Sequence, residues 1–161
     1  MSYLLHPPLL DEIGLSGALR WYTDGLMERS DMDIRLSIAD DFGRLPSDME
    51  LVMFRLVQEC LTNIHRHSGS RSAAIDLSRD EKSVFLSVQD EGKGMSAEEL
   101  AEVRSGGAGV GIRGMRERIR QFDGQMDIES GAQGTEISFR IPLAKSEEKR
   151  TTIAEPIRAV G

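Results

Sequence analysis

Hydrophobic residues follow two different spacings along the first half of the chain. Between residues 9 and 29 they recur broadly every three or four positions, which predicts a helix. Residues 34–38 alternate between apolar and polar side chains, which predicts a half-buried strand. A longer helical stripe begins at Ser47, and Glu50 three residues later completes the sequence pattern of a capping box. We predict that this second helix ends near residues 68–69.

The second half of the chain contains strand patterns in pairs. Alternating runs at 73–77 and 84–88 flank a polar turn and predict a β-hairpin. A glycine-bearing stretch over 92–114 predicts a loop, which is followed by a helix over 115–123. Two alternating runs within 126–141 flank a further turn and predict a second hairpin.

This order of elements predicts an α+β fold. Sequential hairpins favour a mixed, mainly antiparallel sheet, and such a sheet must hide one face under helices. We therefore predict a two-layer α/β sandwich in a single domain, followed by a disordered tail over residues 144–161, which are charged and aperiodic. Neither GxxxxGKS nor GxGxxG follows the first predicted strand, so the two commonest phosphate-binding loops are absent.

Composition excludes several classes of protein and of site. With 20 Lys and Arg against 27 Asp and Glu, the net charge of −7 argues against a nucleic acid partner. Cys60 is the only cysteine, and together with the three histidines it gives neither a disulfide framework nor the spacing of a zinc site. No apolar run approaches the ~20 residues of a membrane span. We expect a cytoplasmic domain without direct membrane contact, any membrane anchor lying elsewhere in a longer parent protein.

Three polar side chains are spaced to share one face of the long central helix. Glu59, Asn63 and His67 follow one another at intervals of four residues. Taken alone, this pattern is more typical of an ordinary solvent-exposed helix surface than of a binding site. Its interpretation therefore depends on the motifs that follow it along the chain.

A second motif, DEGKGM at 90–95, follows directly on a predicted strand. The Asp90 carboxylate could accept a hydrogen bond from the amino group of adenine, while Gly92 and Gly94 would let the backbone approach the ring. A glycine-containing turn is the alternative, because many turns share this composition.

A third motif, GGAGVGIRGMRERI at 106–119, passes from a glycine-dense segment into a helical pattern. The free N–H groups and positive dipole end of a helix N-terminus suit anionic phosphates. Gly134 and Thr135 open the last predicted strand, where a threonine is also simply a good strand former.

Taken in order, the segments ECLTNIHRHS, DEGKG, GVGIRGM and GTEISF resemble the ATPase superfamily of gyrase, the Hsp90 chaperones, histidine kinases and the MutL mismatch-repair proteins. The resemblance covers residues 50–142. Within the superfamily, the chain looks most like the sensor histidine kinases of the nitrate-sensor class, because LLHPPLLDEIGL at 4–15 resembles the junction between their dimerisation helices and ATP domain. The resemblance implies that residues 1–15 are a remnant of this junction and that 16–143 form the ATP-binding catalytic domain.

The resemblance also implies roles for several residues of the first two motifs. Asn63 would coordinate through its amide oxygen the Mg²⁺ ion that also holds the ATP phosphates, and Glu59 would orient a metal-bound water or assist removal of the acceptor's proton. Arg66 and His67 would stand near the phosphates. Asp90 would bind adenine.

Further residues are implied around the base and above the triphosphate. Gly92, Gly94 and Met95 would form the adenine pocket, and Thr135 would assist behind Asp90 through a water molecule. The lid over the triphosphate would have its hinge and rim at three glycines, Gly109, Gly111 and Gly114.

The resemblance implies a set of partners as well. In such a kinase, the γ-phosphoryl group of ATP passes to a histidine and then to an aspartate on a response regulator. That histidine would lie on a helix before the junction, outside this chain, and His6 is rejected as the acceptor because it lies in the junction itself beside two prolines. We therefore expect ATP, Mg²⁺, the phosphoacceptor helix of a homodimeric parent kinase and a response regulator as partners. This chain alone is expected not to autophosphorylate.

Two other functions fit the same superfamily. An anti-sigma factor would phosphorylate or sequester a partner protein, but it would not need the kinase-like junction at 4–15. A degenerate domain would keep the fold without binding nucleotide, and the intact motifs argue against it. Only 14 residues separate Gly94 from Gly109, and so short a lid favours phosphotransfer over the clamps of gyrase and the chaperones.

Overall fold

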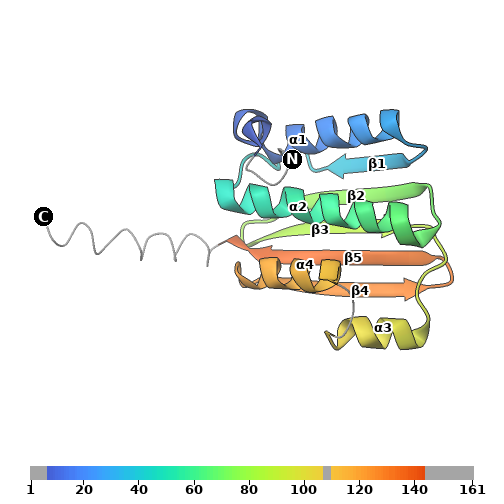
Figure 1. Ribbon diagram of the computed structural model, residues 1–161. Helices are drawn as coiled ribbons and strands as arrows, with labels where there is room; N and C mark the ends of the chain where they lie inside the picture. Colours follow the sequence, from blue (N-terminus) through green and yellow to red (C-terminus); the bar gives the residue numbers. More distant parts are fainter. Residues whose placement is uncertain (1–6, 107–109, 144–161) are drawn as a thin grey trace, which may run out of the picture.

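The computed structural model describes residues 7–106 and 110–143, which form one mixed five-stranded sheet with helices on one face (Figure 1). The strands lie in the order β1-β2-β3-β5-β4. β1 pairs with β2 in parallel, and the other three pairs are antiparallel. The strands span β1 Asp33–Ile38, β2 Ser72–Arg79, β3 Ser83–Asp90, β4 Gln125–Gly131 and β5 Gly134–Pro142.

Three of the helices form the second layer. In Figure 1, α1, α2 and α4 lie across one face of the sheet, and α3 lies at the edge beyond β4. The predicted α+β sandwich with a mainly antiparallel sheet is therefore confirmed. None of the helices among the described residues is long and apolar enough to cross a membrane. The helices span α1 Pro8–Arg29, α2 Ser47–Asn63, the π-helical turn η2 Ile64–Ser68, α3 Ala97–Arg104 and α4 Val110–Arg120.

The core lies between the sheet and the helices because alternate strand residues point toward the helical layer. In the middle of the sheet, Leu86 is the register partner of both Leu77 and Phe139, and all three side chains are buried. Burying each such side chain contributes roughly 1.5–3 kcal/mol. On the opposite face, Arg140 lies over the ring of Phe85, and both side chains are exposed. The sheet is thus covered on one side only.

The predicted boundary between residues 15 and 16 lies inside α1, close to a break in the helix at Gly14. This helix begins at Pro8, and Leu10 and Leu15 are both completely buried. Leu10 and Leu15 therefore belong to the same core as the rest of α1. Residues 1–6 and the predicted tail over 144–161 lie outside the described part of the chain.

The predicted capping box of α2 is not formed. Ser47 is already the first helical residue, because Pro46 takes the N-cap position in a non-helical conformation. Glu50 accepts hydrogen bonds from Leu15, Arg44 and Leu45 instead. The predicted end of this helical segment is confirmed, since η2 ends at Ser68 and is followed by Gly69 in the left-handed conformation.

The prediction of a loop over 92–114 is wrong, because α3 lies inside it and α4 begins at Val110 rather than at Met115. The sequence of α3, AEELAEVR, consists mainly of good helix formers, and its N-cap Ser96 accepts a hydrogen bond from the N–H of Glu99. This Ser-x-x-Glu spacing was the signal that the glycine-based interpretation overlooked.

Candidate functional site

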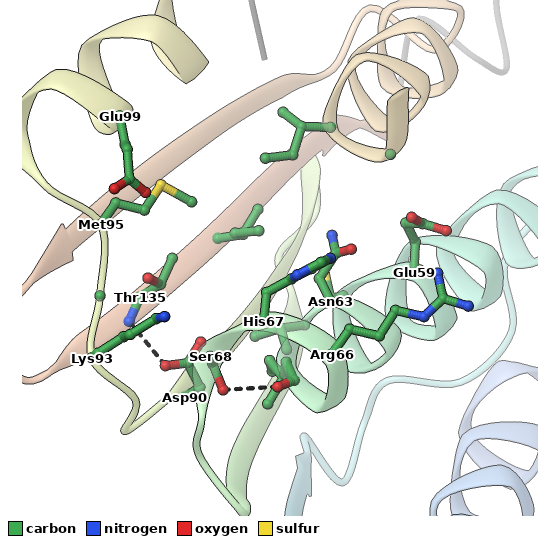
Figure 2. A pocket seen from close by; sticks show the side chains of 17 residues that line it. Glu59, Asn63, Arg66, His67, Ser68, Asp90, Lys93, Met95, Glu99 and Thr135 are labelled. Carbon is green, nitrogen blue, oxygen red and sulfur yellow. Dashed lines mark hydrogen bonds between the residues drawn. The ribbon is translucent and has the colours of Figure 1, made fainter. Parts of the chain in front are cut away.

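A cavity of about 560 Å³ lies between the end of α2 with the turn η2, the end of β3, the start of β5, the segment 91–96 and the start of α4. Figure 2 shows its side chains. Asn63 and His67 belong to the helical wall, and Asp90 and Thr135 lie on the opposite side. The residues that line the cavity are Glu59, Cys60, Asn63, Ile64, Arg66, His67, Ser68, Val88, Asp90, Lys93, Gly94, Met95, Glu99, Gly111, Ile112, Thr135 and Ile137.

Asp90 is the last residue of β3, and only 5% of it is exposed. Its Oδ1 accepts hydrogen bonds from the N–H of Gly92 at 2.8 Å and the N–H of Thr135 at 3.2 Å. Within the described residues, Oδ2 makes no hydrogen bond. One oxygen thus holds the carboxylate in place, and the other is available to a ligand in the cavity.

Ser130 is a supporting residue that sequence reasoning missed. Its Oγ accepts a hydrogen bond from the N–H of Met95 at 2.7 Å and lies 2.8 Å from Oγ1 of Thr135. It therefore connects the segment 91–96 to the β4–β5 hairpin. No local signal marks Ser130, because a single serine in a strand is unremarkable until the segment that it binds is placed.

The glycines of the DEGKGM motif are required by contacts within the protein. A Cβ at Gly92 would clash with the backbone of Ser68, and Gly92 does not line the cavity. Gly94 has a φ of +72°, and a Cβ there would clash with the carbonyl oxygen of Gly131. The close approach that we predicted between Gly92 and a ligand ring is therefore an approach to Ser68. Gly94 does line the cavity.

The helical wall places Glu59 and Asn63 at the cavity, both half-buried. Among the described residues, neither side chain makes a hydrogen bond or an ion pair. The predicted spacing of four residues per turn holds from Glu59 to Asn63 but not from Asn63 to His67. The turn after Asn63 is π-helical and contains an additional residue. Arg66 and His67 still line the cavity from this turn, where both are exposed.

Two of the three predicted lid glycines lie in a helix and not in the loop that we predicted. Gly111 and Gly114 lie inside α4, and Gly109 lies outside the described residues. A Cβ at Gly111 would meet Oε1 of Glu59, the flexible end of that side chain, so Gly111 lies directly against Glu59 where α4 faces α2 at the cavity. Gly114 does not line the cavity and has no neighbouring atom within 4 Å of a Cβ position. Tertiary packing therefore overrides the low helix propensity of these glycines.

Apolar side chains line the cavity beneath the polar ones. Val88 and Ile137 are register partners on β3 and β5, and both are buried. Each lies two positions from a predicted site residue, Asp90 or Thr135, and so points to the same face of its strand. The two-residue alternation of side chains along a strand could therefore have predicted Val88 and Ile137 as cavity residues. Lys93 and Ile112 also line the cavity without having been predicted.

Comparisons with known proteins identify a family and related kinases. The family model described as histidine kinase-, DNA gyrase B- and HSP90-like ATPase matches residues 48–145. The sensor histidine kinase MctS of Rhizobium johnstonii is 29% identical over 142 residues, which cover 88% of this chain and 30% of MctS. NarS, a sensor histidine kinase of Mycobacterium tuberculosis, is 28% identical over 144 residues, or 89% of this chain and 33% of NarS. The chain thus spans about a third of the length of these curated relatives.

A solved structure supports the fold independently. The catalytic domain of the histidine kinase ThkA superposes with a TM-score of 0.61 at 17% identity, over 80% of this chain and 91% of that one. The nitrate-sensor class stays a prediction. Because the family model matches more than half of the chain, the chain belongs to the histidine kinase-, DNA gyrase B- and HSP90-like ATPase family.

Proposed function

We propose that this chain binds ATP with Mg²⁺ and presents the γ-phosphoryl group to a histidine on the dimerisation helix of a homodimeric parent kinase. An aspartate of a response regulator then receives the phosphoryl group. The observation that supports this proposal is the common cavity of Asn63 and Asp90, each of which has a polar atom without a partner among the described residues.

The base of ATP belongs at the Asp90 end of the cavity. Oδ2 of Asp90 is an acceptor suited to the amino group of adenine, and Val88 and Ile137 offer apolar surface to the ring. Thr135 holds Asp90 through its backbone N–H and lines the cavity, so its side chain can contact the base through a water molecule. Met95 lies on the same side of the cavity, and the preceding Gly94 also lines it.

The triphosphate belongs at the helical end. The amide oxygen of Asn63 is a hard ligand, and Mg²⁺ commonly combines one or two protein oxygens with phosphate oxygens and water. No group of three or more His, Cys, Asp or Glu among the described residues could hold a metal, which fits an ion bound mainly by the nucleotide. Such an ion neutralises charge on the phosphates. Arg66 and His67 lie beside Asn63, and Glu59 is one helical turn away, where it can orient water or accept the acceptor's proton.

Replacing Asn63 with alanine is expected to remove the magnesium-dependent part of nucleotide binding. Calorimetric titration with ADP should show affinity that rises with Mg²⁺ in the unchanged protein and responds roughly tenfold less in the variant. Gln58→Ala is the matched control, because Gln58 is an amide on the same helix that does not line the cavity. An undiminished response to Mg²⁺ in Asn63→Ala would contradict the proposed metal ligand.

Incubation of this chain with γ-labelled ATP is expected to leave no acid-labile phosphohistidine on it. The same incubation with the full-length parent kinase should label a histidine that lies before residue 1 of this chain. Labelling of this chain alone, at His6 or elsewhere, would refute an external acceptor. Absence of labelling in the parent kinase would refute the phosphotransfer itself.

A further inference from the structure

A buried carboxylate outside the nucleotide cavity connects α1 to α2. Glu50 lies in the first turn of α2, is 1% exposed and does not line the cavity. Its Oε2 accepts hydrogen bonds from the N–H of Leu15 at 3.2 Å, Nε of Arg44 at 3.1 Å and the N–H of Leu45 at 3.4 Å. Oε1 accepts a fourth, from Nη2 of Arg44 at 3.1 Å. A charge is buried only at high cost unless it is paired and hydrogen-bonded, and here both conditions are met.

The contact lies at a break in α1. Gly14 has φ 76° and ψ 179°, so residues 8–13 and 15–29 are two helical segments that meet at an angle. The N–H of Leu15 opens the second segment, where a carboxylate also complements the positive end of the helix dipole. A Cβ at Gly14 would lie 2.7 Å from Cδ of Arg44, and the positive φ independently favours glycine.

Arg44 holds the other side of the break. Its Nη2 donates to the carbonyl oxygen of Asp11 at 3.2 Å, so one guanidinium contacts the segment before Gly14 and the carboxylate that caps the segment after it. Hydrogen bonding to Glu50, together with the charge of that carboxylate, raises the pKa of Arg44 above its ordinary value. Ser47 adds a further contact, since its Oγ lies 3.3 Å from Oδ1 of Asp11.

We propose that the ion pair of Arg44 and Glu50 is a positioning device that sets the direction in which the chain preceding Pro8 leaves the domain. Glu50 lies on the helix that also carries Glu59 and Asn63, nine and thirteen residues further on, or about 14 and 20 Å along the axis. The break at Gly14 is thereby held against the helix of the nucleotide site. This inference rests on the proposed function, because a phosphoacceptor attached before Pro8 is delivered to the cavity only if that direction is fixed.

The direction can be measured by the distance between two spin labels. Cysteines at Glu12, which is exposed before the break, and at Asp76, which is exposed on the open face of the sheet, provide the labelling sites. Burial raises the pKa of the Cys60 thiol, so this residue does not compete for the label. In the doubly labelled protein that keeps Arg44, we expect one narrow distribution of distances between the labels. When Arg44→Ala is added, we expect this distribution to broaden or shift. An identical distribution in both proteins would overturn the proposal.

The consequence for catalysis is measured in the full-length parent kinase. Arg44→Ala is expected to reduce autophosphorylation at least tenfold while ADP affinity changes less than about twofold, because Arg44 lies away from the cavity. Arg120→Ala is the matched control, since it breaks the exposed ion pair with Glu117 and is expected to change neither quantity. Equal losses of ADP affinity and autophosphorylation in Arg44→Ala would indicate a merely structural role and overturn the inference.

A milder variant covers the case in which Arg44→Ala does not fold. Arg44→Lys keeps the charge but not the geometry that joins Glu50 to Asp11, so it is expected to fold and to lose autophosphorylation in part. Full autophosphorylation by Arg44→Lys with a broadened label distribution would overturn the link to catalysis. If the unchanged parent kinase forms no phosphohistidine, the proposed function fails, whereas the label distances still decide whether the ion pair sets the direction.

Discussion

Replacing Asp90 with asparagine is expected to weaken ADP binding about 10- to 100-fold while the fold is retained. The asparagine Oδ1 can still accept hydrogen bonds from the N–H groups of Gly92 and Thr135, which hold the native side chain. The atom that replaces Oδ2 is an amide nitrogen. Its N–H groups are donors, and they would face the amino group of adenine, which is also a donor. Loss of a hydrogen bond to a charged group costs about 1.5–3 kcal/mol, which corresponds to this range of affinity.

Calorimetric titration with ADP measures this effect, and thermal unfolding checks that the variant is folded. Asp76→Asn is the matched control, because Asp76 undergoes the same substitution in a strand but is exposed on the open face of the sheet. The control is expected to bind ADP as tightly as the unchanged protein. If both variants bind equally well, the assignment of adenine to Asp90 is wrong.

Replacing Gly94 with alanine is expected to lower the free energy of unfolding by about 2–5 kcal/mol and to weaken nucleotide binding as well. The φ of +72° is unfavourable for alanine, and the added Cβ would clash with the carbonyl oxygen of Gly131. The clash is with backbone, so no side-chain rotation relieves it. Strained backbone and overpacking each cost about 1–3 kcal/mol. Relief requires the segment 91–96 to move away from the hairpin turn, together with Lys93 and Met95 of the cavity.

Urea denaturation gives the change in stability, and titration with ADP gives the change in binding. Gly131→Ala is a control at the other side of the same contact, since a Cβ there meets no atom within 4 Å and its φ is not positive. The control is expected to stay within about 0.5 kcal/mol of the unchanged protein. Equal stability of the two variants would contradict the packing of segment 91–96 on the β4–β5 turn.

The sequence predicted most of the fold because strands and buried helices are specified by the spacing of apolar residues. Both hairpins, the strand near 34–38 and the two long helices are present where the periodicity placed them. Prediction failed between 92 and 114, where glycine and charge suggested a loop. Glycine lowers helix propensity but does not forbid a helix, and Gly111 lies inside α4 directly against the side chain of Glu59 on α2.

For the site, the sequence determined by itself the residue types and their order: Glu59 and Asn63 on one helix, then Asp90 after a strand, then Thr135 at the start of another. Only the tertiary structure decided that these residues share one cavity, that Ser130 supports it, and that Gly92 approaches Ser68. It alone revealed that Glu50, which resembles a helix cap in the sequence, is a buried partner of Arg44. The physical reason is that spacing along a helix or strand specifies the direction of a side chain, whereas its partner depends on segments distant in sequence that only packing brings together.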